Sequence, residues 1–254
     1  MNPQEPEGKP ACGAAPPGAR SEGEAARQVR EMFGRIAPRY DLLNHLLSAS
    51  FDRLWRARTA HAVAKLLRRP GVRVLDLCCG TGDLTLALAR AAQASRITGA
   101  DFVHGMLTRA AEKSSRSGSR ASYVEADALA MPFPAASFDL VTSAFGFRNL
   151  ANYQRGLAEI HRLLAPGGEA GILEFCEPRG AVMGPLYRFY FRHLLPRIGG
   201  AISGDAAAYQ YLPSSVARFP EPEDLSEQMR RAGFRTVTFE RWTGGIVALH
   251  RGVK

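Results

Sequence analysis

One short stretch, residues 74–84, limits most strongly what this chain can fold into. It reads VLDLCCGTGDL, so an apolar run leads into small residues and then into a pattern compatible with a helix. Gly80 and Gly82 have no Cβ, which lets the backbone turn sharply and lets a ligand approach it closely. The stretch predicts a strand, a tight ligand-binding loop around Thr81 and a helix. A purely structural turn and a dinucleotide-binding loop share this pattern and stay open as alternatives.

The segments that follow repeat the same unit. Apolar runs of β-type composition alternate with stretches whose apolar residues recur at three- and four-residue spacing. Strands that alternate with helices are typical of a parallel sheet with helices on both faces. The predicted fold class is therefore α/β, with a Rossmann-like, doubly wound and mostly parallel sheet. We expect strands at residues 72–77, 96–100, 122–125, 138–143 and 168–175, and helices that end near residues 92, 114 and 164.

Three regions flank this repeated pattern. Residues 1–25 are rich in Pro, Gly, Ala and Glu and lack bulky apolar side chains, so we expect a disordered tail. Residues 26–70 have helical periodicity and predict N-terminal helices ahead of the sheet. Residues 176–220 follow the fifth strand, and their many Pro, Gly and aromatic residues are interpreted as an insertion that covers the substrate. The domain, residues 26–254, would end in a helix and two strands at residues 225–232, 236–241 and 245–249.

Acidic residues accompany three successive strands. Asp76 belongs to the first strand, Asp101 ends the second, and Asp127 with Ala128 ends the third. Asp101 is placed to accept hydrogen bonds from ribose hydroxyls, and Asp127 to reach an adenine amino group. Because carboxylates repel a pyrophosphate, the pattern favours a nucleoside ligand without phosphates. The combination resembles the class I S-adenosylmethionine-dependent methyltransferases. This resemblance implies that the cofactor S-adenosyl-L-methionine binds at Asp76, Gly80, Thr81, Gly82, Asp101, Asp127 and Ala128.

Further segments resemble one family, the ubiquinone/menaquinone biosynthesis C-methyltransferases. The first is YDLLN at residues 40–44, which is followed by Leu47-Ser48 and Trp55. The chain departs from the family at Asp52, where His or Asn is usual, and at Ala144, where serine is common. The remaining similar segments are RLLAPGG at residues 162–168, LEFC at 173–176, AFGFRN at 144–149, SGD at 203–205, YQYLP at 209–213 and GGIVALH at 244–250.

The resemblance implies a reaction, the transfer of a methyl group from S-adenosylmethionine to a ring carbon of a prenylated quinol precursor. A ring carbon beside a phenolic hydroxyl becomes nucleophilic when that hydroxyl loses its proton. The enzyme must then align the two partners and stabilise the phenolate. Conversion of demethylmenaquinol to menaquinol is the favoured interpretation. The equivalent methylation in ubiquinone biosynthesis, and a methyltransferase for another lipid or phenolic substrate, stay open as alternatives.

Four residues are expected to act on this substrate. Arg148 stays protonated and would stabilise the phenolate, while Asn149 would orient a ring oxygen. Asp205 and Tyr209 would line the quinol pocket, with Tyr211 beside them. Each has a structural alternative: Arg148 could pair with an acid beneath the sheet, and the two tyrosines could be packing aromatics. The sequence does not assign a proton acceptor.

The net charge of +9 favours an anionic partner. Residues 186–197 read LYRFYFRHLLPR and mix large apolar side chains with cations. An interfacial membrane helix has this composition, and so does a helix packed on its own domain. We therefore expect peripheral contact with an anionic membrane. Nucleic acid is not an expected partner, because the sequence contains no RNA-binding module and its basic residues form no stripe.

The sequence also predicts where the chain resides. No apolar run approaches the roughly 18 residues needed to span a bilayer, and the acidic, Pro-rich start does not resemble a targeting peptide. A cytoplasmic location is therefore expected. The four cysteines, Cys12, Cys78, Cys79 and Cys176, show no CxxC spacing, so we expect neither a metal site nor a disulfide framework. The sequence makes no prediction of oligomeric state.

Overall fold

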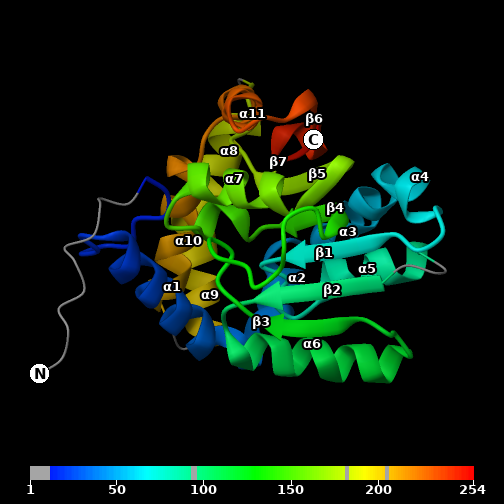
Figure 1. Cartoon of the computed structure of the whole chain (residues 1–254). Coiled ribbons are helices and arrows are strands. Elements are labelled where there is room, and N and C mark those ends of the chain that lie inside the picture. The colour runs from blue at the N-terminus through cyan, green and yellow to red at the C-terminus, as the bar shows by residue number, and fades with distance from the viewer. Residues whose placement is uncertain (1–11, 93–95, 181–182, 204–205) are drawn as a thin grey trace, which may run out of the picture.

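A seven-stranded sheet forms the centre of the computed structural model, which describes residues 12–92, 96–180, 183–203 and 206–254. The strand order is β3-β2-β1-β4-β5-β7-β6, and β7 runs antiparallel to both of its neighbours while the other pairs are parallel. The α/β fold class with a doubly wound, mostly parallel sheet is thus confirmed (Figure 1). The strands are β1 (Arg73–Leu77), β2 (Arg96–Asp101), β3 (Ser122–Glu125), β4 (Phe138–Ala144), β5 (Leu164–Phe175), β6 (Arg235–Trp242) and β7 (Val247–Val253).

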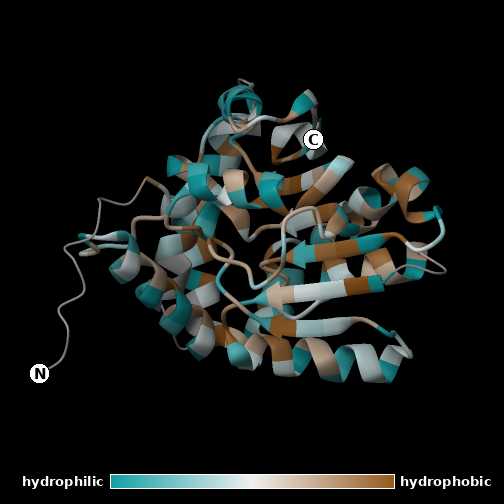
Figure 2. Ribbon diagram, in the orientation of Figure 1, coloured by the Kyte–Doolittle hydropathy of each residue, from teal (hydrophilic) through white to brown (hydrophobic). Residues whose placement is uncertain are grey.

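Helices cover both faces of the sheet because its central strands are apolar on both sides. Neighbouring residues of a strand point to opposite faces, and Val74 and Leu75 of β1 are both fully buried. Leu75 packs with α7 (Tyr153–Leu163) and α11 (Pro222–Arg231), whereas Val74 packs with α5 (Asp83–Ala91). The helix α6 (His104–Ser117) lies beside β3 and β2. Figure 2 shows apolar residues within the sheet and polar residues on the outside of α1 and α11.

From residue 12 onward, four α-helices precede the sheet: α1 (Glu22–Ile36), α2 (Tyr40–Leu47), α3 (Phe51–Ala62) and α4 (Ala64–Leu67). They lie against elements from the far end of the chain. Trp55 of α3 is buried with Trp242 and Val247, and its indole Nε1 donates a hydrogen bond to Oγ1 of Thr243 at 2.8 Å. The N-terminal helices are thereby attached to the last two strands of the sheet.

The expected tail, residues 1–25, lies partly in the described chain. Ser21 caps α1 by accepting a hydrogen bond from the backbone N–H of Glu24, so the helix begins at Glu22. Ala25 is fully buried, and the N–H of Ala14 donates to the carbonyl of Leu150 at 2.7 Å. Small residues can be buried without bulky side chains beside them in the sequence. Composition alone therefore suggested that the folded domain begins later, at residue 26. The division into a tail and a domain at residue 26 stays a prediction.

The expected insertion, residues 176–220, is mostly helical. It contains α8 (Met183–Phe189), a π-helical turn (Tyr190–Leu194), α9 (Leu195–Ser203) and α10 (Ala206–Arg218). Tyr187, Phe191 and Leu195 pack against Leu43 of α2. These helices lie with α1 at the carboxyl ends of the strands, the side to which the arrows of β1 and β2 point in Figure 1. That position is suitable for a substrate cover, a role that stays a prediction.

Three predicted strand limits need corrections. β5 begins at Leu164 and not at residue 168, β7 extends to Val253 beyond the predicted residue 249, and β3 ends at Glu125, two residues before Asp127. The carboxylate of Asp127 instead accepts a hydrogen bond from the N–H of Leu129 at 2.8 Å, which forms a local turn.

Among the helices in the described ranges, none has the length and apolar character needed to cross a bilayer.

Candidate active site

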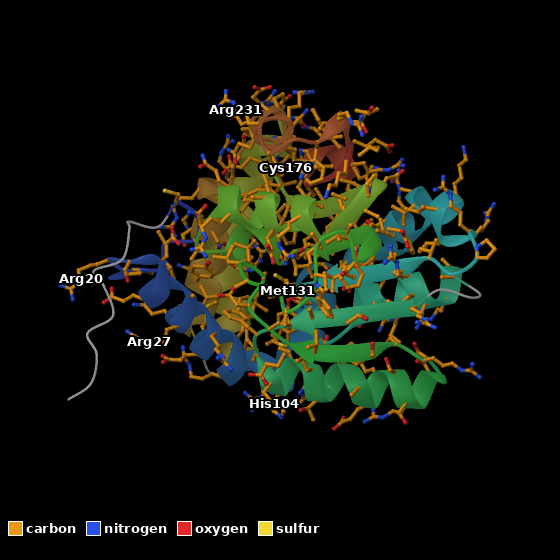
Figure 3. The ribbon with its side chains drawn as sticks, viewed as in Figure 1. Arg20, Arg27, His104, Met131, Cys176 and Arg231 are labelled. Atoms are coloured by element: carbon orange, nitrogen blue, oxygen red, sulfur yellow. The ribbon has the colours of Figure 1, made fainter. Side chains whose placement is uncertain are left out.

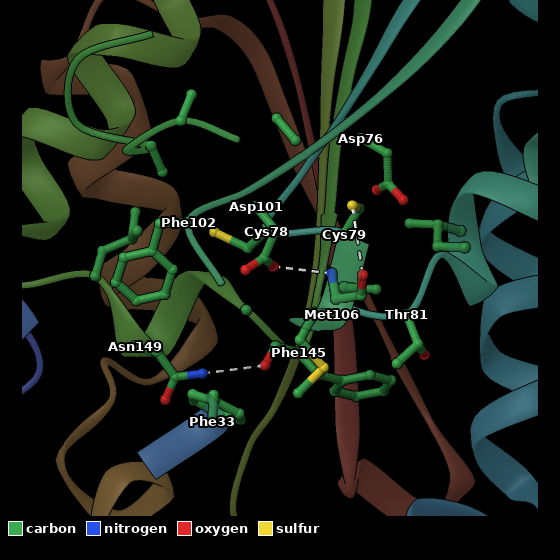
Figure 4. Close-up of a pocket in the computed structure, with 18 of the residues that line it drawn as sticks. Phe33, Asp76, Cys78, Cys79, Thr81, Asp101, Phe102, Met106, Phe145 and Asn149 are labelled. Atoms are coloured by element: carbon green, nitrogen blue, oxygen red, sulfur yellow. Dashed lines mark hydrogen bonds between the residues drawn. The ribbon is translucent and has the colours of Figure 1, made fainter. Parts of the chain in front are cut away.

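A pocket of about 940 Å³, counted with its open mouth, lies at the carboxyl ends of β1, β2 and β4. The loops that follow these strands form one wall, and Phe33 of α1 and Tyr40 of α2 contribute to the opposite one. Ligands of parallel α/β sheets bind at this edge, because the strand order reverses there. Figure 4 shows the side chains that point into this space from both walls.

The loop between β1 and α5 curves under the pocket with an unusual backbone. Cys78 and Gly80 both have positive φ, at 54° and 55°. A Cβ added to Gly80 would meet only Tyr40 Cε1, at 3.9 Å, so the space beside this glycine is open to a ligand. Gly82 differs, since a Cβ there would lie 2.9 Å from the Tyr123 hydroxyl. Gly82 therefore allows close packing of the loop against β3 and α6, and it is not among the described residues that line the pocket.

Asp101 at the end of β2 points into the pocket (Figure 4). One carboxylate oxygen accepts a hydrogen bond from the N–H of Gly80 and the other from the N–H of Val103, both at 2.9 Å. Burial raises the pKa of this carboxyl, and these backbone N–H groups act to lower it. Each oxygen keeps a second lone pair. Asp101 can therefore accept two further hydrogen bonds, as a ribose with neighbouring hydroxyls requires.

Asp76 also lines the pocket, but both of its carboxylate oxygens already accept hydrogen bonds from neighbouring elements. Thr85 of α5 and Thr142 of β4 donate hydrogen bonds to its two oxygens, at 2.6 and 3.0 Å. Burial raises the pKa of Asp76 to about 6, against which the two threonine hydroxyls act. Asp76 thus joins β1 to the adjacent strand and to the helix that follows the loop.

The far end of the pocket is less polar. Asp127 is exposed, whereas Ala128 is buried, and both line the pocket together with Leu129. Phe102 and Met106 add apolar surface near Asp101 (Figure 4). An exposed carboxylate beside apolar side chains is a suitable environment for a flat heterocycle that carries an amino group, such as adenine.

Arg148 does not line the pocket. Its side chain is 5% exposed, and Nη1 forms an ion pair with Glu174 at 3.1 Å while also donating to the carbonyl of Phe145. Nε donates to the hydroxyl of Ser215 at 3.3 Å. This is the structural alternative, pairing with an acid, and the predicted contact with a phenolate has no support in this geometry.

Asn149 lines the pocket, and its role of orienting a ring oxygen stays a prediction. Its Nδ2 donates to the carbonyl of Phe145 at 3.4 Å, and the Tyr211 hydroxyl donates to its Oδ1 at 3.2 Å. Tyr211 is buried beside it. Asp205 lies outside the described residues, and so does the side chain of Tyr209. The structure therefore brings Asn149 and Tyr211 together and leaves the other two predicted substrate contacts untested.

Among the pocket residues to which the sequence analysis assigned no role, Tyr40 and Arg56 carry groups that can donate hydrogen bonds. Tyr40 belongs to the YDLLN segment, and burial raises the pKa of its hydroxyl. Arg56 follows Trp55 on α3, and its guanidinium lies 5.4 Å from the centre of the Phe145 ring. Which face of an N-terminal helix meets the pocket depends on how that helix docks on the sheet. From the sequence, only the position of Arg56 next to Trp55, a residue of the family motif, could have indicated that Arg56 lines the pocket.

Acids near Arg56 could suggest a metal site. Ligand atoms of His45, Asp52 and Asp83 lie within 4.8 Å of one another. However, Nη1 of Arg56 forms ion pairs with both Asp52 and Asp83, at 3.7 Å in the latter case. The guanidinium, together with Lys113 Nζ at 2.5 Å from Asp83, thus supplies positive charge in this cluster. Burial raises the pKa of the thiols of Cys78 and Cys79 well above the ordinary value.

The strand order with its antiparallel β7, the loop at Gly80 and the acid at the end of β2 together define a class I S-adenosylmethionine-dependent methyltransferase. A family model described as the ubiE/COQ5 methyltransferase family matches residues 21–254. The chain belongs to this family.

Similar proteins agree with this membership. The chain is 50% identical over 221 residues to a protein of Thermus thermophilus named demethylmenaquinone methyltransferase, covering 87% of this chain and 99% of that one. It is 48% identical over 231 residues to a protein of the same name from Deinococcus radiodurans, covering 91% and 94%. A crystal structure of a SAM-dependent methyltransferase from Thermotoga maritima has the same fold, with a TM-score of 0.62, 19% identity, and coverage of 88% and 99%.

Proposed function

We propose that this enzyme transfers the methyl group of S-adenosylmethionine to a ring carbon of demethylmenaquinol, which yields menaquinol. The observation that carries this proposal is a pocket that combines a nucleoside-type half, at Asp101 and Ala128, with an aromatic half at Phe33, Tyr40 and Phe145. Membership in the methyltransferase family supports the reaction type. The names of the similar proteins from Thermus and Deinococcus support the choice of a naphthoquinol.

The residues present fit the cofactor. Asp101 has free lone pairs for two ribose hydroxyls, and the open space beside Gly80 allows a ligand to lie against the loop backbone. Asp127 and Ala128 would hold the adenine. Thr81 lines the pocket from the loop between β1 and α5, next to Gly80. When bound, S-adenosylmethionine supplies a methyl group on a positively charged sulfur.

The substrate side would be formed by the segment after β4. Asn149 is fixed between Tyr211 and the carbonyl of Phe145, so its amide can orient a ring oxygen without moving. We assign Arg148 a positioning role: its ion pair with Glu174 and its bond to the Phe145 carbonyl fix this segment. Asp205 and Tyr209 stay our proposed lining of the quinol pocket, on the strength of the family resemblance alone.

A methyl-transfer assay with labelled S-adenosylmethionine tests the proposal. Demethylmenaquinol and the demethylated ubiquinol precursor would each be offered in reduced and oxidised form. We expect transfer to the reduced naphthoquinol and none to its quinone, because only the quinol can form a phenolate. Transfer to the benzoquinol alone would assign the enzyme to ubiquinone biosynthesis. If neither quinol is methylated while the cofactor still binds, the substrate class is wrong.

We also propose that the enzyme docks reversibly on an anionic membrane, from which a prenylated quinol would enter. Two sets of exposed apolar side chains support this, one on α2 and α3 and the other from α8 to α9. The two sets lie on contacting elements, since α2 packs on α9 and the Tyr190 hydroxyl donates to the carbonyl of Leu47. We call them the apolar patch: Leu42, Leu46, Phe51, Leu54, Leu186, Phe189, Leu194 and Ile198.

A further inference from the structure

Arg56 is the single basic side chain among the described residues that line the pocket. It extends from α3 and is 7% exposed. The same lining contains four carboxylates, from Asp76, Asp83, Asp101 and Asp127. A pocket of this composition suits a ligand that is mostly cationic or neutral but carries one negative group near Arg56. Nothing in the methyl transfer proposed above makes use of this guanidinium.

The anchoring of Arg56 leaves part of it available. Nη1 is paired with Asp52 and lies 3.7 Å from Asp83. Asp52 is itself fixed by Oγ of Ser48 at 2.8 Å and Nδ1 of His45 at 2.9 Å. Burial acts to raise the pKa of Asp52, but Arg56 and these hydrogen bonds together hold it below the ordinary value. Among the residues that the structure describes, no hydrogen-bond acceptor contacts Nη2 or Nε of Arg56.

The fold indicates which part of the cofactor reaches this guanidinium. With ribose at Asp101 on β2 and adenine at Asp127 after β3, the nucleoside lies over one side of the sheet. The amino-acid part must then extend toward β1 and β4. Arg56 lies there, because it pairs with Asp83 at the start of α5 and stacks on Phe145 after β4.

We propose that Arg56 binds the α-carboxylate of the methionyl part of S-adenosylmethionine. The inference rests on the cofactor placement proposed above. An arginine that is held through one terminal nitrogen can donate from its remaining N–H groups to a carboxylate, and such charge-assisted bonds are among the strongest in proteins. Asp52, with His45 and Ser48 behind it, would act as the positioning group that keeps the guanidinium directed into the pocket.

Calorimetric binding of two ligands tests this assignment: S-adenosylmethionine and its decarboxylated analogue, which differs only in lacking the carboxylate. We expect the wild-type protein to bind S-adenosylmethionine at least about tenfold more tightly than the analogue. In R56Q this ratio should fall to about threefold or less, while the Kd of the analogue stays close to the wild-type value. R58Q is the matched control, because Arg58 lies on the same helix and stacks on Trp242 outside the pocket. It should keep the wild-type ratio.

Two results would overturn the proposal. One is a wild-type protein that binds both ligands equally well, which needs no variant. The other is an R56Q protein that keeps the wild-type ratio. If R56Q does not fold, R56Q/D52N replaces it, because this variant also removes the buried carboxylate that pairs with Arg56. An unchanged ratio in that variant has the same meaning. No quinol is present, so these results do not depend on the substrate. A protein that binds neither ligand would instead contradict the cofactor placement itself.

Discussion

At the scale of single residues, Asp101 is the side chain whose geometry most directly implies a ligand. Each of its carboxylate oxygens accepts one backbone hydrogen bond and keeps one free lone pair, although the group is almost completely buried. A buried acceptor with unused capacity normally has a polar partner. In this enzyme the partner we expect is the ribose of the cofactor.

We therefore predict that Asp101→Ala weakens binding of S-adenosylmethionine about 30-fold or more, since two hydrogen bonds to a charged acceptor are lost. Calorimetry measures the Kd. The control is Glu125→Gln on the adjacent strand, whose carboxylate contacts Arg30 and His104 at the surface and not the pocket. The assignment of Asp101 fails if D101A folds and binds the cofactor as the wild type does.

Residue roles could be predicted from sequence only where the backbone decides them. Asp101 is the last residue of β2 and Gly80 lies three residues after β1, so the sheet fixes their place at its edge. Long side chains behave differently. Arg148 was predicted to contact the substrate but is used inside the protein by Glu174, whereas Arg56 was not predicted and lines the pocket. Their direction depends on tertiary packing, which no local pattern encodes.

At the scale of elements, β7 is joined to α11 by one buried histidine. Nε2 of His250 donates to the carbonyl of Pro222, the first residue of that helix, at 2.9 Å. Burial lowers the pKa of His250 to about 4, against which this hydrogen bond acts. The folded protein thus holds the ring neutral at pH values where the unfolded chain would already protonate it.

We predict that this difference makes stability dependent on pH. Between pH 6.5 and pH 4 the unfolded state binds the extra proton, so the free energy of unfolding should fall by up to about 3 kcal/mol as the pH decreases through this window. Above pH 6.5 the contribution is constant. Urea denaturation at several pH values measures it. His250→Gln keeps an N–H donor but cannot titrate, so it should lose this part of the slope. An equal slope in both proteins would contradict the assignment.

Elements of the sheet were predictable because parallel strands in a doubly wound fold are buried on both faces and therefore consist of uninterrupted apolar residues. Their extents agree closely where this holds, as at β1 (Arg73–Leu77), whose last four residues are all buried. The helices of the insertion, residues 176–220, were harder to predict from the sequence. The π-helical turn Tyr190–Leu194 and a helix that contains Pro213 have no local signal of their own, and both depend on packing against α1 and α2.

At the scale of the whole molecule, the exposed large apolar side chains of the described chain lie on a few elements, whereas basic side chains are spread over the surface. Basic side chains such as Arg20, Arg27 and Arg231 project from the periphery (Figure 3). The exposed large apolar residues, in contrast, belong to the apolar patch on α2, α3 and the helices of the insertion. The net charge of +9 adds an attraction to anionic lipids that is not confined to one face.

We predict that L46E/F189E reduces binding to anionic vesicles by about tenfold or more, because two apolar side chains can no longer enter the interface. Vesicle sedimentation measures this effect. R230Q/R231Q on α11 is the matched control, since it lowers the net charge by the same two units away from the patch. Equal losses in the two double variants would indicate binding through charge alone. A wild-type protein that binds no vesicles would contradict the docking proposal.

The bond between Trp55 and Thr243 has a consequence for how the enzyme is synthesised. Its two partners are 188 positions apart, so this bond forms only after the last strands have been translated. A nascent chain that already contains every cofactor-loop residue can pack α3 on α5, but it lacks the bond that fixes α3 to the end of the sheet. Closing so long a loop is slow compared with local folding. The wall that carries Arg56 therefore gains its last anchor only when almost the complete polypeptide has been synthesised, and a late premature stop codon would yield a chain without that anchor.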